Sequence, residues 1–502
     1  MGYIHAQDFI MLLLGIDVGT SSIKVSVVEA VTQTCLASAS YPDQEASIKS
    51  LNTGWAEQSP RSWWDYTRQA IRKVHATGRY RPEDITAIGI SYQMHGLVLV
   101  DKEGEPLRDS IIWCDSRAVD IGNNAFAAIG EDRCLSCLLN SPGNFTASKL
   151  AWVKNNEPEL FSRIHKMMLP GDYIAMKLTG EITTTASALS EGILWDFEKD
   201  ALSDDVMNHY GFVSDLIPEV RPLFSSHGEV RKDVAEELLL KPGIPVSYKA
   251  GDQLNNALSL NVLQPGEVAA TAGTSGVIYA VTDRLFSDEH SRVNAFAHVN
   301  HTAEEKRLGV LLCINGTGIL NRWVREICGG TLSYAELNHE AARIAPGSDG
   351  LLVLPFGNGA ERMLRNRMVG AHLLNADLNK HRQAHIFRAA QEGIAFSFRY
   401  GLDIMRSNGL HPNIIRAGRA NMFLSDVFVQ SFVNATGVPV ELYNNDGSVG
   451  AALGAGIGAR IFSRAADAFS NLQPLRRVEP EANSHYETFY GNWKEELALR
   501  EG

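Results

Sequence analysis

Two segments of the chain share nearly the same pattern and lie half a chain length apart. Each is an apolar run, a Gly-Thr-Ser turn and a second β-branched run; residues 14–25 carry the turn at Gly19, and residues 270–279 carry it at Gly273. This pattern predicts a strand–turn–strand hairpin. Glycine permits turn conformations closed to other residues, and successive N–H groups there can form an anion-binding concavity. One such turn has ordinary structural uses, but the pair predicts two similar domains that each offer a phosphate-binding turn to a shared cleft.

Between the two turns, the segment Lys249–Asn256 presents one carboxylate, that of Asp252. Small residues precede the acid and an apolar-rich segment follows it, as where a strand ends and a helix begins. The ordinary interpretation is that Asp252 caps this helix through backbone N–H groups. Its position between two phosphate-type turns makes a reactive carboxylate the alternative.

Composition limits the classes of function. A chain of 502 residues is too long for one core and suits two domains. The net charge of −12 argues against general nucleic-acid or anionic-membrane binding. Six cysteines form no disulfide framework, and the lone Cys134–Cys137 CxxC pair is a weak metal signal. We expect a reduced, cytoplasmic protein. We expect the residues Met1–Gln7 to be a short polar overhang or an upstream start, and the run Phe9–Ile16 to be a first strand, too short to span a bilayer.

Asp17 ends that first strand. An acid in an apolar strand is costly unless it is paired or bound to a cation. Because hard cations prefer oxygen ligands and keep much of their water, Asp17 beside a phosphate turn could hold Mg²⁺. The alternative is that it caps its own turn.

Further polar clusters follow predicted strands. The buried run Ile85–Ile90 leads into Ser91–Gly96, and ligands of open α/β sheets bind beyond the carboxyl ends of strands. Gln93 and His95 there offer donors and acceptors suited to a polyol, although a lone histidine is more often structural. Asp115 and Arg117 form a similar cluster, with a surface ion pair of little worth as the alternative. Residues 144–156 predict an amphipathic helix, and Thr179–Asp196 a hairpin or meander.

Four motifs in matching order resemble the FGGY carbohydrate kinases from Leu12 to about Ala459. They are Gly15–Thr20, Gln93–Gly96, the Thr-x-x-Lys-Leu-x-Trp helix at Thr146, and Gly-Asp-Gln at 251–253 followed by Gly-Thr-Ser-Gly at 273–276. The Gln-Met-His-Gly stretch is most similar to the xylulokinases. The resemblance implies an α/β fold of two ribonuclease-H-like domains, the actin/hexokinase-type ATPase arrangement, with an interdomain active-site cleft. It divides the chain into a sugar-binding domain with the first phosphate turn (1–255), a nucleotide-binding domain (256–465) and a C-terminal tail (466–502).

The resemblance also implies roles for individual residues. Asp252 is the expected general base and Asp17 the expected Mg²⁺·ATP ligand. Substrate contacts are expected from Gln93, Met94, His95, Asp252 and Gln253. Nucleotide contacts are expected from Gly19, Thr20, Ser21, Gly273, Thr274, Ser275, Gly318, Gly418 and Asn421.

The implied reaction is ATP-dependent phosphorylation of a ketopentose, D-xylulose, at its terminal hydroxyl, with a homodimer also considered. Gln253 stands where xylulokinases usually have Asn, Ala417–Asn421 lacks the usual Gly-Gly-Gly run, and 315–318 is unusually Gly-rich. Kinases of glycerol, ribulose, gluconate or other ketoses are therefore alternatives. A non-catalytic, actin-like ATP-binding protein is the alternative from another class, and Asp252 with the Gln-Met-His-Gly stretch argues against it.

Overall fold

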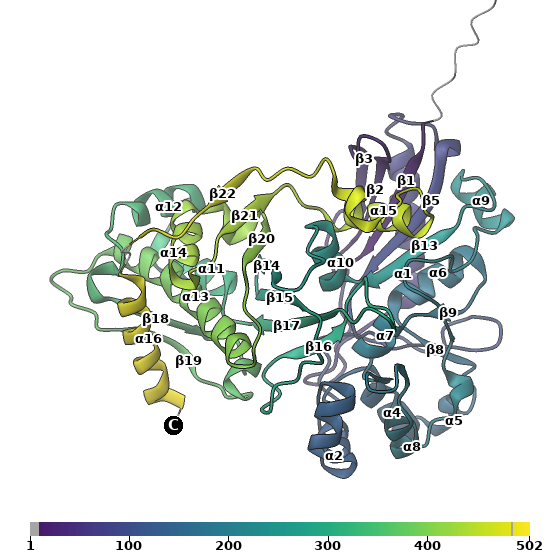
Figure 1. Cartoon of the computed structure of the whole chain (residues 1–502), viewed down its shortest axis with the longest axis horizontal. Helices are drawn as coiled ribbons and strands as arrows, with labels where there is room; N and C mark the ends of the chain where they lie inside the picture. Colours follow the sequence, from purple (N-terminus) through teal and green to yellow (C-terminus); the bar gives the residue numbers. More distant parts are fainter. Residues whose placement is uncertain (1–9, 483–484, 502) are drawn as a thin grey trace, which may run out of the picture. The chain divides into compact units, whose positions relative to one another are not determined.

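A computed structural model describes residues 10–482 and 485–501 of the chain (Figure 1). The predicted overhang Met1–Gln7 lies outside the described residues. The chain separates into two compact units. The first contains the described residues up to Asn261, with Ala297–Lys306 and Asp446–Leu472; the second contains Val262–Phe296, Arg307–Asn445 and the described residues from Gln473 onward.

A mixed five-stranded sheet forms the centre of the first unit. Its strand order is β13 (Val246–Gly251), β5 (Ile85–Tyr92), β1 (Leu12–Val18), β2 (Ile23–Glu29) and β3 (Cys35–Tyr41). Strands β1 and β2 form an antiparallel hairpin, β2 pairs antiparallel with β3, and β5 pairs parallel with both β1 and β13. The predicted hairpin around the first Gly-Thr-Ser turn is thus confirmed.

The second unit repeats this arrangement within a seven-stranded sheet. Its strand order is β16 (Asn294–Ala297), β17 (Leu308–Ile314), β15 (Gly276–Thr282), β14 (Glu267–Ala272), β20 (Ile414–Gly418), β21 (Val440–Tyr443) and β22 (Arg476–Val478). Here β14 and β15 form the antiparallel hairpin, β17 pairs antiparallel with β15, and β14, β20 and β21 pair parallel in succession. Five strands therefore have the same order and directions in both units, which confirms two ribonuclease-H-like domains.

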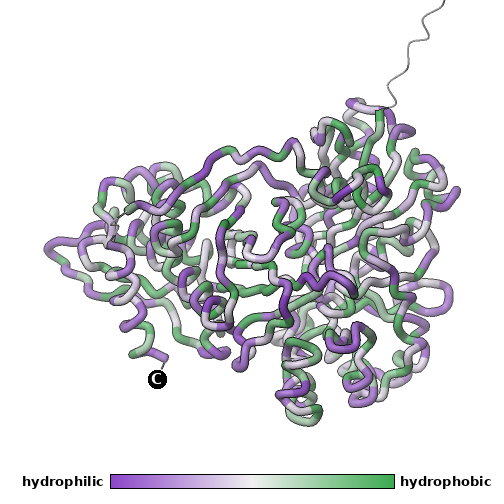
Figure 2. Tube along the Cα trace, in the orientation of Figure 1, coloured by the Kyte–Doolittle hydropathy of each residue, from purple (hydrophilic) through white to green (hydrophobic). Residues whose placement is uncertain are grey.

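The remaining strands are short and lie outside the two central sheets. They are β4 (Glu57–Gln58), β6 (Val98–Val100), β7 (Ser110–Ile111), β8 (Lys166–Met168), β9 (Thr183–Thr184), β10 (Trp195–Asp196), β11 (Ala201–Leu202), β12 (Glu219–Val220), β18 (Leu352–Phe356) and β19 (Gly370–Leu374). Figure 2 shows hydrophobic residues concentrated along the central strands. This distribution agrees with the near-complete burial of β1, β5 and β13.

The described α-helices range from one turn to 25 residues. They are α1 (Pro60–His75), α2 (Val119–Ile129), α3 (Glu131–Arg133), α4 (Thr146–Asn156), α5 (Pro158–Phe161), α6 (Pro170–Thr179), α7 (Ala186–Glu191), α8 (Asp204–Tyr210), α9 (Lys232–Leu238), α10 (Asp252–Ser259), α11 (Gly318–Val324), α12 (Tyr334–Ala342), α13 (Gln383–Ser407), α14 (Asp426–Thr436), α15 (Gly447–Gly458) and α16 (Tyr486–Glu501). Within the described ranges, no helix is both long and apolar enough to cross a bilayer.

Two local predictions were wrong. The segment Thr179–Asp196 is not a hairpin, because helix α7 occupies its middle and β9 and β10 pair with other strands. Helix α4 is not amphipathic in its first two turns, where every side chain from Thr146 to Ala151 is buried. Both segments lie inside the first unit, where tertiary packing overrides the local sequence pattern.

Helix α15 belongs to the first unit, although it follows all strands of the second unit except β22 in sequence. It packs on β1, β2, β5 and β13 (Figure 1). Glycines make the contact: a Cβ atom on Gly15 would lie 1.7 Å from the carbonyl oxygen of Ser448, and one on Gly89 would lie 1.9 Å from that of Ala451. Helix α15 is itself rich in small residues, and the glycines on the sheet permit this close packing.

We expect Gly89→Ala to destabilise the protein by about 1–3 kcal/mol or more, because the added methyl group must push α15 off the sheet. Urea denaturation followed by tryptophan fluorescence measures this change. Gly491→Ala is the control: it lies inside α16 with nothing within 4 Å of the added Cβ, so helix propensity predicts no loss of stability. Equal midpoints for both variants would contradict the proposed contact.

Candidate active site

Asp252 stands where strand β13 gives way to helix α10. Gly251 is the N-cap residue and Asp252 is the first helical residue. The predicted strand, acid and helix are therefore present, and the capping position falls on the glycine. A Cβ atom on Gly251 would lie 2.6 Å from Cγ of Met94, so the absence of a side chain lets Met94 pack against the residue that precedes the acid.

Asp17 lies at the end of β1, in register with Ser91 on β5. Its carboxylate faces the first turn of α15, because a Cβ atom on Gly447 would lie 2.5 Å from Asp17 Oδ2. The pKa of Asp17 is raised, chiefly by burial and also by the charge of Asp446, while Ser91 and Lys24 act in the opposite direction. Two carboxylates and a helix N-terminus thus meet at this strand end.

The surroundings of Asp252 raise the pKa of its carboxyl to about 7. Burial is the largest cause and the charge of Asp17 is the second, while a hydrogen bond from the Gln253 side chain favours the ionised form. Among the described residues, Gln253 Oε1 is buried and has no hydrogen-bond partner. A buried carbonyl oxygen without a partner is unfavourable unless a ligand or water supplies the donor.

Three of the predicted sugar residues, Gln93, Met94 and His95, lie on the loop that follows β5. Gln93 is buried; its Nε2 donates to Gln58 Oε1 at 3.1 Å, and its Oε1 accepts from Thr20 Oγ1 at 3.3 Å. The loop is thereby joined to the first Gly-Thr-Ser turn. His95 has a left-handed backbone with φ of 62°, which is uncommon for a residue with a side chain. Its ring Nδ1 lies 2.9 Å from the carbonyl oxygen of Glu191, which can only accept, so Nδ1 carries the hydrogen.

Glu191 is a site residue that sequence reasoning missed, because its segment was predicted to be a hairpin. It ends helix α7 and is completely buried. Its carboxylate accepts from the Tyr92 hydroxyl at 2.6 Å and from the His95 backbone N–H at 3.2 Å. Burial raises its pKa to about 8, and the charge of Asp252 acts in the same direction. No sequence motif around Glu191 signals this role.

The cluster at Asp115 is buried, which corrects its alternative interpretation as a surface pair. The Arg117 side chain is only 1% exposed, and its guanidinium bonds Asp115 and Glu57, each at 2.7 Å. The guanidinium carbon also lies 3.8 Å from the centre of the Trp55 ring. This cluster fixes the loop of residues 112–117, and the indole N–H of Trp113 in that loop donates to Thr20 Oγ1 at 3.0 Å.

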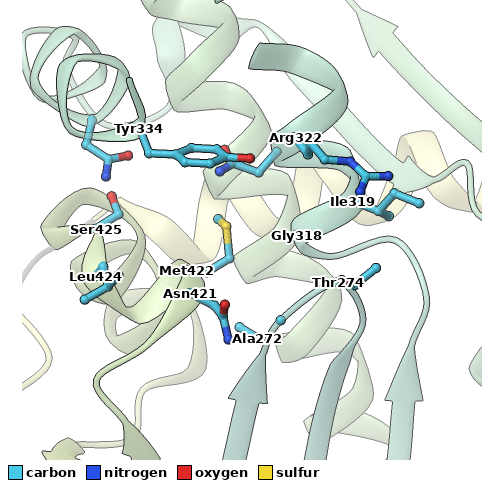
Figure 3. A pocket seen from close by; sticks show the side chains of 13 residues that line it. Ala272, Thr274, Gly318, Ile319, Arg322, Tyr334, Asn421, Met422, Leu424 and Ser425 are labelled. Carbon is cyan, nitrogen blue, oxygen red and sulfur yellow. The ribbon is translucent and has the colours of Figure 1, made fainter. Parts of the chain in front are cut away.

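The second unit contains a pocket of about 310 Å³ beside the second Gly-Thr-Ser turn (Figure 3). Four of the predicted nucleotide residues line it, namely Gly273, Thr274, Gly318 and Asn421, whereas Ser275 and Gly418 do not. Figure 3 shows the turn at one side of this space and Tyr334 at the other. The remaining lining residues, which the sequence did not signal as a group, are Ala272, Ile319, Asn321, Arg322, Tyr334, Asn338, Met422, Leu424 and Ser425.

The start of α11 holds the second turn in place. The backbone N–H of Gly318 donates to Gly273 O at 2.9 Å, and that of Ile319 donates to Thr274 O at 3.0 Å. A Cβ atom on Gly318 would lie 2.3 Å from Gly273 O, so this approach needs glycine. Tyr334, Met422 and Leu424 add aromatic and apolar surface, and such pockets suit a small organic ligand.

The repeated sheets and the two Gly-Thr-Ser turns define a two-domain α/β fold of the sugar-kinase type. Residues 12–259 match the N-terminal domain and residues 268–459 the C-terminal domain of the FGGY family of carbohydrate kinases, so the chain belongs to this family.

Individual relatives agree with this assignment. The chain is 28% identical over 478 residues to the xylulose kinase of Escherichia coli (strain K12), covering 94% of each chain. It is 29% identical over 461 residues to that of Bacillus subtilis (strain 168), covering 90% and 89%. Among solved structures, a "xyloylose kinase" from Brucella ovis superposes with a TM-score of 0.88 at 25% identity, covering 97% and 99%.

Two more distant structures share the fold. The gluconate kinase of Lactobacillus acidophilus has a TM-score of 0.88 at 20% identity, covering 98% of this chain and 99% of its own. The glycerol kinase of Plasmodium falciparum, solved with ADP, has a TM-score of 0.87 at 18% identity, covering 98% of each chain.

We expect Asp252→Asn to stabilise the protein at neutral and alkaline pH. Folding raises the pKa of this carboxyl from 3.8 to about 7. The protein therefore loses stability as pH rises between these two values, and the loss is complete above pH 7. The uncharged amide avoids this loss. The melting temperature of the variant should therefore exceed that of the unmodified protein by an amount that grows from pH 4 to pH 7 and then stays constant. A difference independent of pH would contradict the raised pKa.

Proposed function

We propose that the protein transfers the γ-phosphate of ATP to the terminal hydroxyl of a ketopentose, D-xylulose, giving D-xylulose 5-phosphate and ADP. The observation that carries the proposal is Asp252: a carboxylate at a strand end, beside Asp17, with a pKa raised to about 7. General bases work best when their pKa lies near the operating pH. The names of the relatives that match over nearly the whole chain support D-xylulose as the acceptor.

In the proposed reaction, Asp252 accepts the proton of the attacking sugar hydroxyl. The hydroxyl oxygen forms a bond to the γ-phosphorus while the bond from that phosphorus to the ADP oxygen breaks. Phosphoryl transfer depends mainly on positioning and on stabilising charge. Backbone and hydroxyl donors of Gly19, Thr20 and Ser21 would serve the transferred phosphate.

The residues around Asp17 fit a magnesium ion. Carboxylate oxygens are the ligands that Mg²⁺ prefers, and the charge of Asp446 makes Asp17 harder to ionise. Asp17 would hold the ion, directly or through water. When bound, Mg²⁺ supplies positive charge to the phosphate oxygens. Lys24, which pairs with Asp446, supplies part of this compensation from the chain itself.

Sugar contacts are assigned to Met94, His95 and Gln253. The unpartnered, buried Oε1 of Gln253 would accept a hydrogen bond from a sugar hydroxyl, while the amide of the same side chain favours the ionised form of Asp252. Gln93 contributes by fixing the loop, because its own amide bonds Gln58 and Thr20.

The pocket of the second unit is the proposed nucleotide site. Gly273 and Thr274 would serve the phosphates, and Tyr334 with Met422 would receive the adenine. Asn421, with a left-handed φ of 52°, lies close to the turn, because a Cβ atom on Gly273 would be 3.5 Å from Asn421 Nδ2. Contacts from Ser275 and Gly418 stay predictions of the sequence, as do the cytoplasmic location and the homodimer.

A different acceptor is the second candidate. Gln253 follows the proposed base where xylulokinases usually have Asn. The carboxamide of Gln253 forms a hydrogen bond with the carboxylate of Asp252. The longer side chain changes the space and the hydrogen-bonding positions offered to a sugar. Glycerol, D-ribulose and D-gluconate are therefore included in the test.

The test measures ADP release from Mg²⁺·ATP with each of these acceptors and D-xylulose, for the unmodified protein and for Asp252→Asn. We expect the highest kcat/KM with D-xylulose and a loss of about 10²–10⁴-fold in the variant, the usual contribution of general base catalysis. Turnover only of another acceptor would keep the base and discard D-xylulose. ADP binding without turnover of any acceptor would favour a non-catalytic protein.

The pH dependence gives a separate check on Asp252. Because only the ionised carboxylate can accept a proton, kcat/KM should fall tenfold per pH unit below a pKa of about 7. Replacing Asp17 with Asn removes a neighbouring negative charge and should move this limb to lower pH. A kcat/KM that does not change between pH 5 and pH 8 would contradict the assignment of Asp252 as the general base.

Replacing Tyr334 with Ala should weaken Mg²⁺·ADP binding about tenfold, the loss of roughly 1.4 kcal/mol of stacking and apolar contact. Isothermal titration calorimetry measures this affinity. Trp323→Ala is the matched control, since Trp323 is an exposed aromatic residue of α11 outside the pocket lining. Equal affinities for the two variants would place the base of the nucleotide elsewhere.

A further inference from the structure

Helix α4 turns three motif side chains toward the strand-end loops of the first unit. Thr146, Lys149 and Trp152 recur every three residues and therefore lie on one side of the helix. Thr146 and Lys149 are completely buried. The Trp152 ring meets that of Trp55 edge-on at 5.3 Å and lies 4.9 Å from the guanidinium of Arg117. This face contacts two loops, residues 93–96 after β5 and residues 112–117 after β7.

Lys149 joins these two loops. Its Nζ donates to the carbonyl oxygen of His95 at 2.9 Å and to that of Ile112 at 3.0 Å. Within the described ranges, no carboxylate oxygen lies within 4 Å of this ammonium group, so its direct partners are neutral carbonyl oxygens. Burying an ammonium group on such terms is unfavourable, and burial lowers its pKa to about 7. An apolar side chain of the same length would fill this space more favourably, which indicates that the donor itself is needed.

The carbonyl that Lys149 holds belongs to the residue with the most constrained backbone in the loop. His95 has a left-handed φ of 62°. Its backbone N–H donates to Glu191 Oε2 at 3.2 Å, and its carbonyl oxygen accepts from both Lys149 and Thr146, the latter at 3.2 Å. Such conformations persist only when the surroundings hold them, and they cluster at functional sites. The ring of His95 is oriented by this backbone.

We propose that Lys149 is a positioning residue for the sugar acceptor, tying the carbonyl of His95 to that of Ile112 and so fixing the His95 ring without touching the sugar. Thr146 supports it through a second hydrogen bond to the same carbonyl. The inference rests on the proposed function, because it requires the acceptor to contact His95. It gives a physical purpose to the Thr-x-x-Lys-Leu-x-Trp motif, whose polar members both hold this one peptide group.

The test compares Lys149→Met, Thr146→Val and Ser148→Ala in the ADP-release assay, with KM and kcat determined separately for sugar and ATP. Lys149→Met should lower kcat/KM for the sugar at least tenfold and leave the KM for ATP within twofold. Thr146→Val should lower kcat/KM for the sugar only about threefold, because Lys149 still donates to the carbonyl oxygen of His95. Ser148 is the control: it is equally buried in α4, but its hydroxyl faces Tyr210 and Pro142, so its variant should stay within twofold.

A rescue experiment separates positioning from a general loss of stability. Lys149→Ala removes the chain beyond Cβ, and propylammonium ion replaces the missing atoms. Millimolar propylammonium should restore at least threefold of the lost sugar kcat/KM in Lys149→Ala and have no effect on Thr146→Val. 1-Fluoropropane, of equal length but without a hydrogen-bond donor, should restore none. Equal rescue by both additives would show a role in filling space only and overturn the proposal.

The outcomes distinguish the two proposals. An inactive unmodified protein removes the proposed function and the inference with it. An active protein in which Lys149→Met behaves like Ser148→Ala removes the inference alone. Should Lys149→Met fail to fold, Thr146→Val is compared with Thr146→Ser, which keeps the hydroxyl. Equal sugar kcat/KM values in these two variants overturn the inference.

Discussion

In the first unit the backbone of α15 packs directly against the glycines of the sheet, and the rest of the site depends on this contact. Gly15 and Gly89 have no side chains, so the backbone carbonyl groups of Ser448 and Ala451 can contact the sheet surface directly. Any side chain there would hold the helix away. Because α15 lies so close to the sheet, its first turn reaches the end of β1. The N-terminus of α15 therefore lies beside the carboxylate of Asp17. A packing requirement thus sets the electrostatics of the site.

Buried carboxyl groups dominate the electrostatics of the site. Asp17, Asp252 and Glu191 all have raised pKa values, with burial as the leading cause in each. The chain compensates this only in part, through Lys24, the Tyr92 hydroxyl and backbone N–H groups. Functional sites commonly retain such unfavourable groups because they prepare a reaction, and stability is lost in exchange. The raised pKa that supports Asp252 as the proposed base also makes its carboxylate a source of instability.

The sequence predicts the architecture well and the supporting contacts poorly. The repeated hairpins were visible because strand–turn–strand patterns are local, and Asp17 and Asp252 were visible because an acid ending an apolar run is anomalous. Glu191 could not be found this way, since its partners Tyr92 and His95 are about 100 positions away and its segment has no strong period. The buried state of Arg117 depends likewise on Glu57 and Trp55, which only the fold brings near.

The order in which the chain supplies its parts has a consequence for biosynthesis. The strands of the first unit are made early, but α15, the helix that covers their glycine face, comes at Gly447–Gly458, after most of the second unit. During synthesis, the strands of the first unit therefore emerge from the ribosome long before α15, the helix that packs on them. Until nearly the whole chain has been synthesised, Gly15 and Gly89 lack the helix that packs on them, and the first unit stays incomplete.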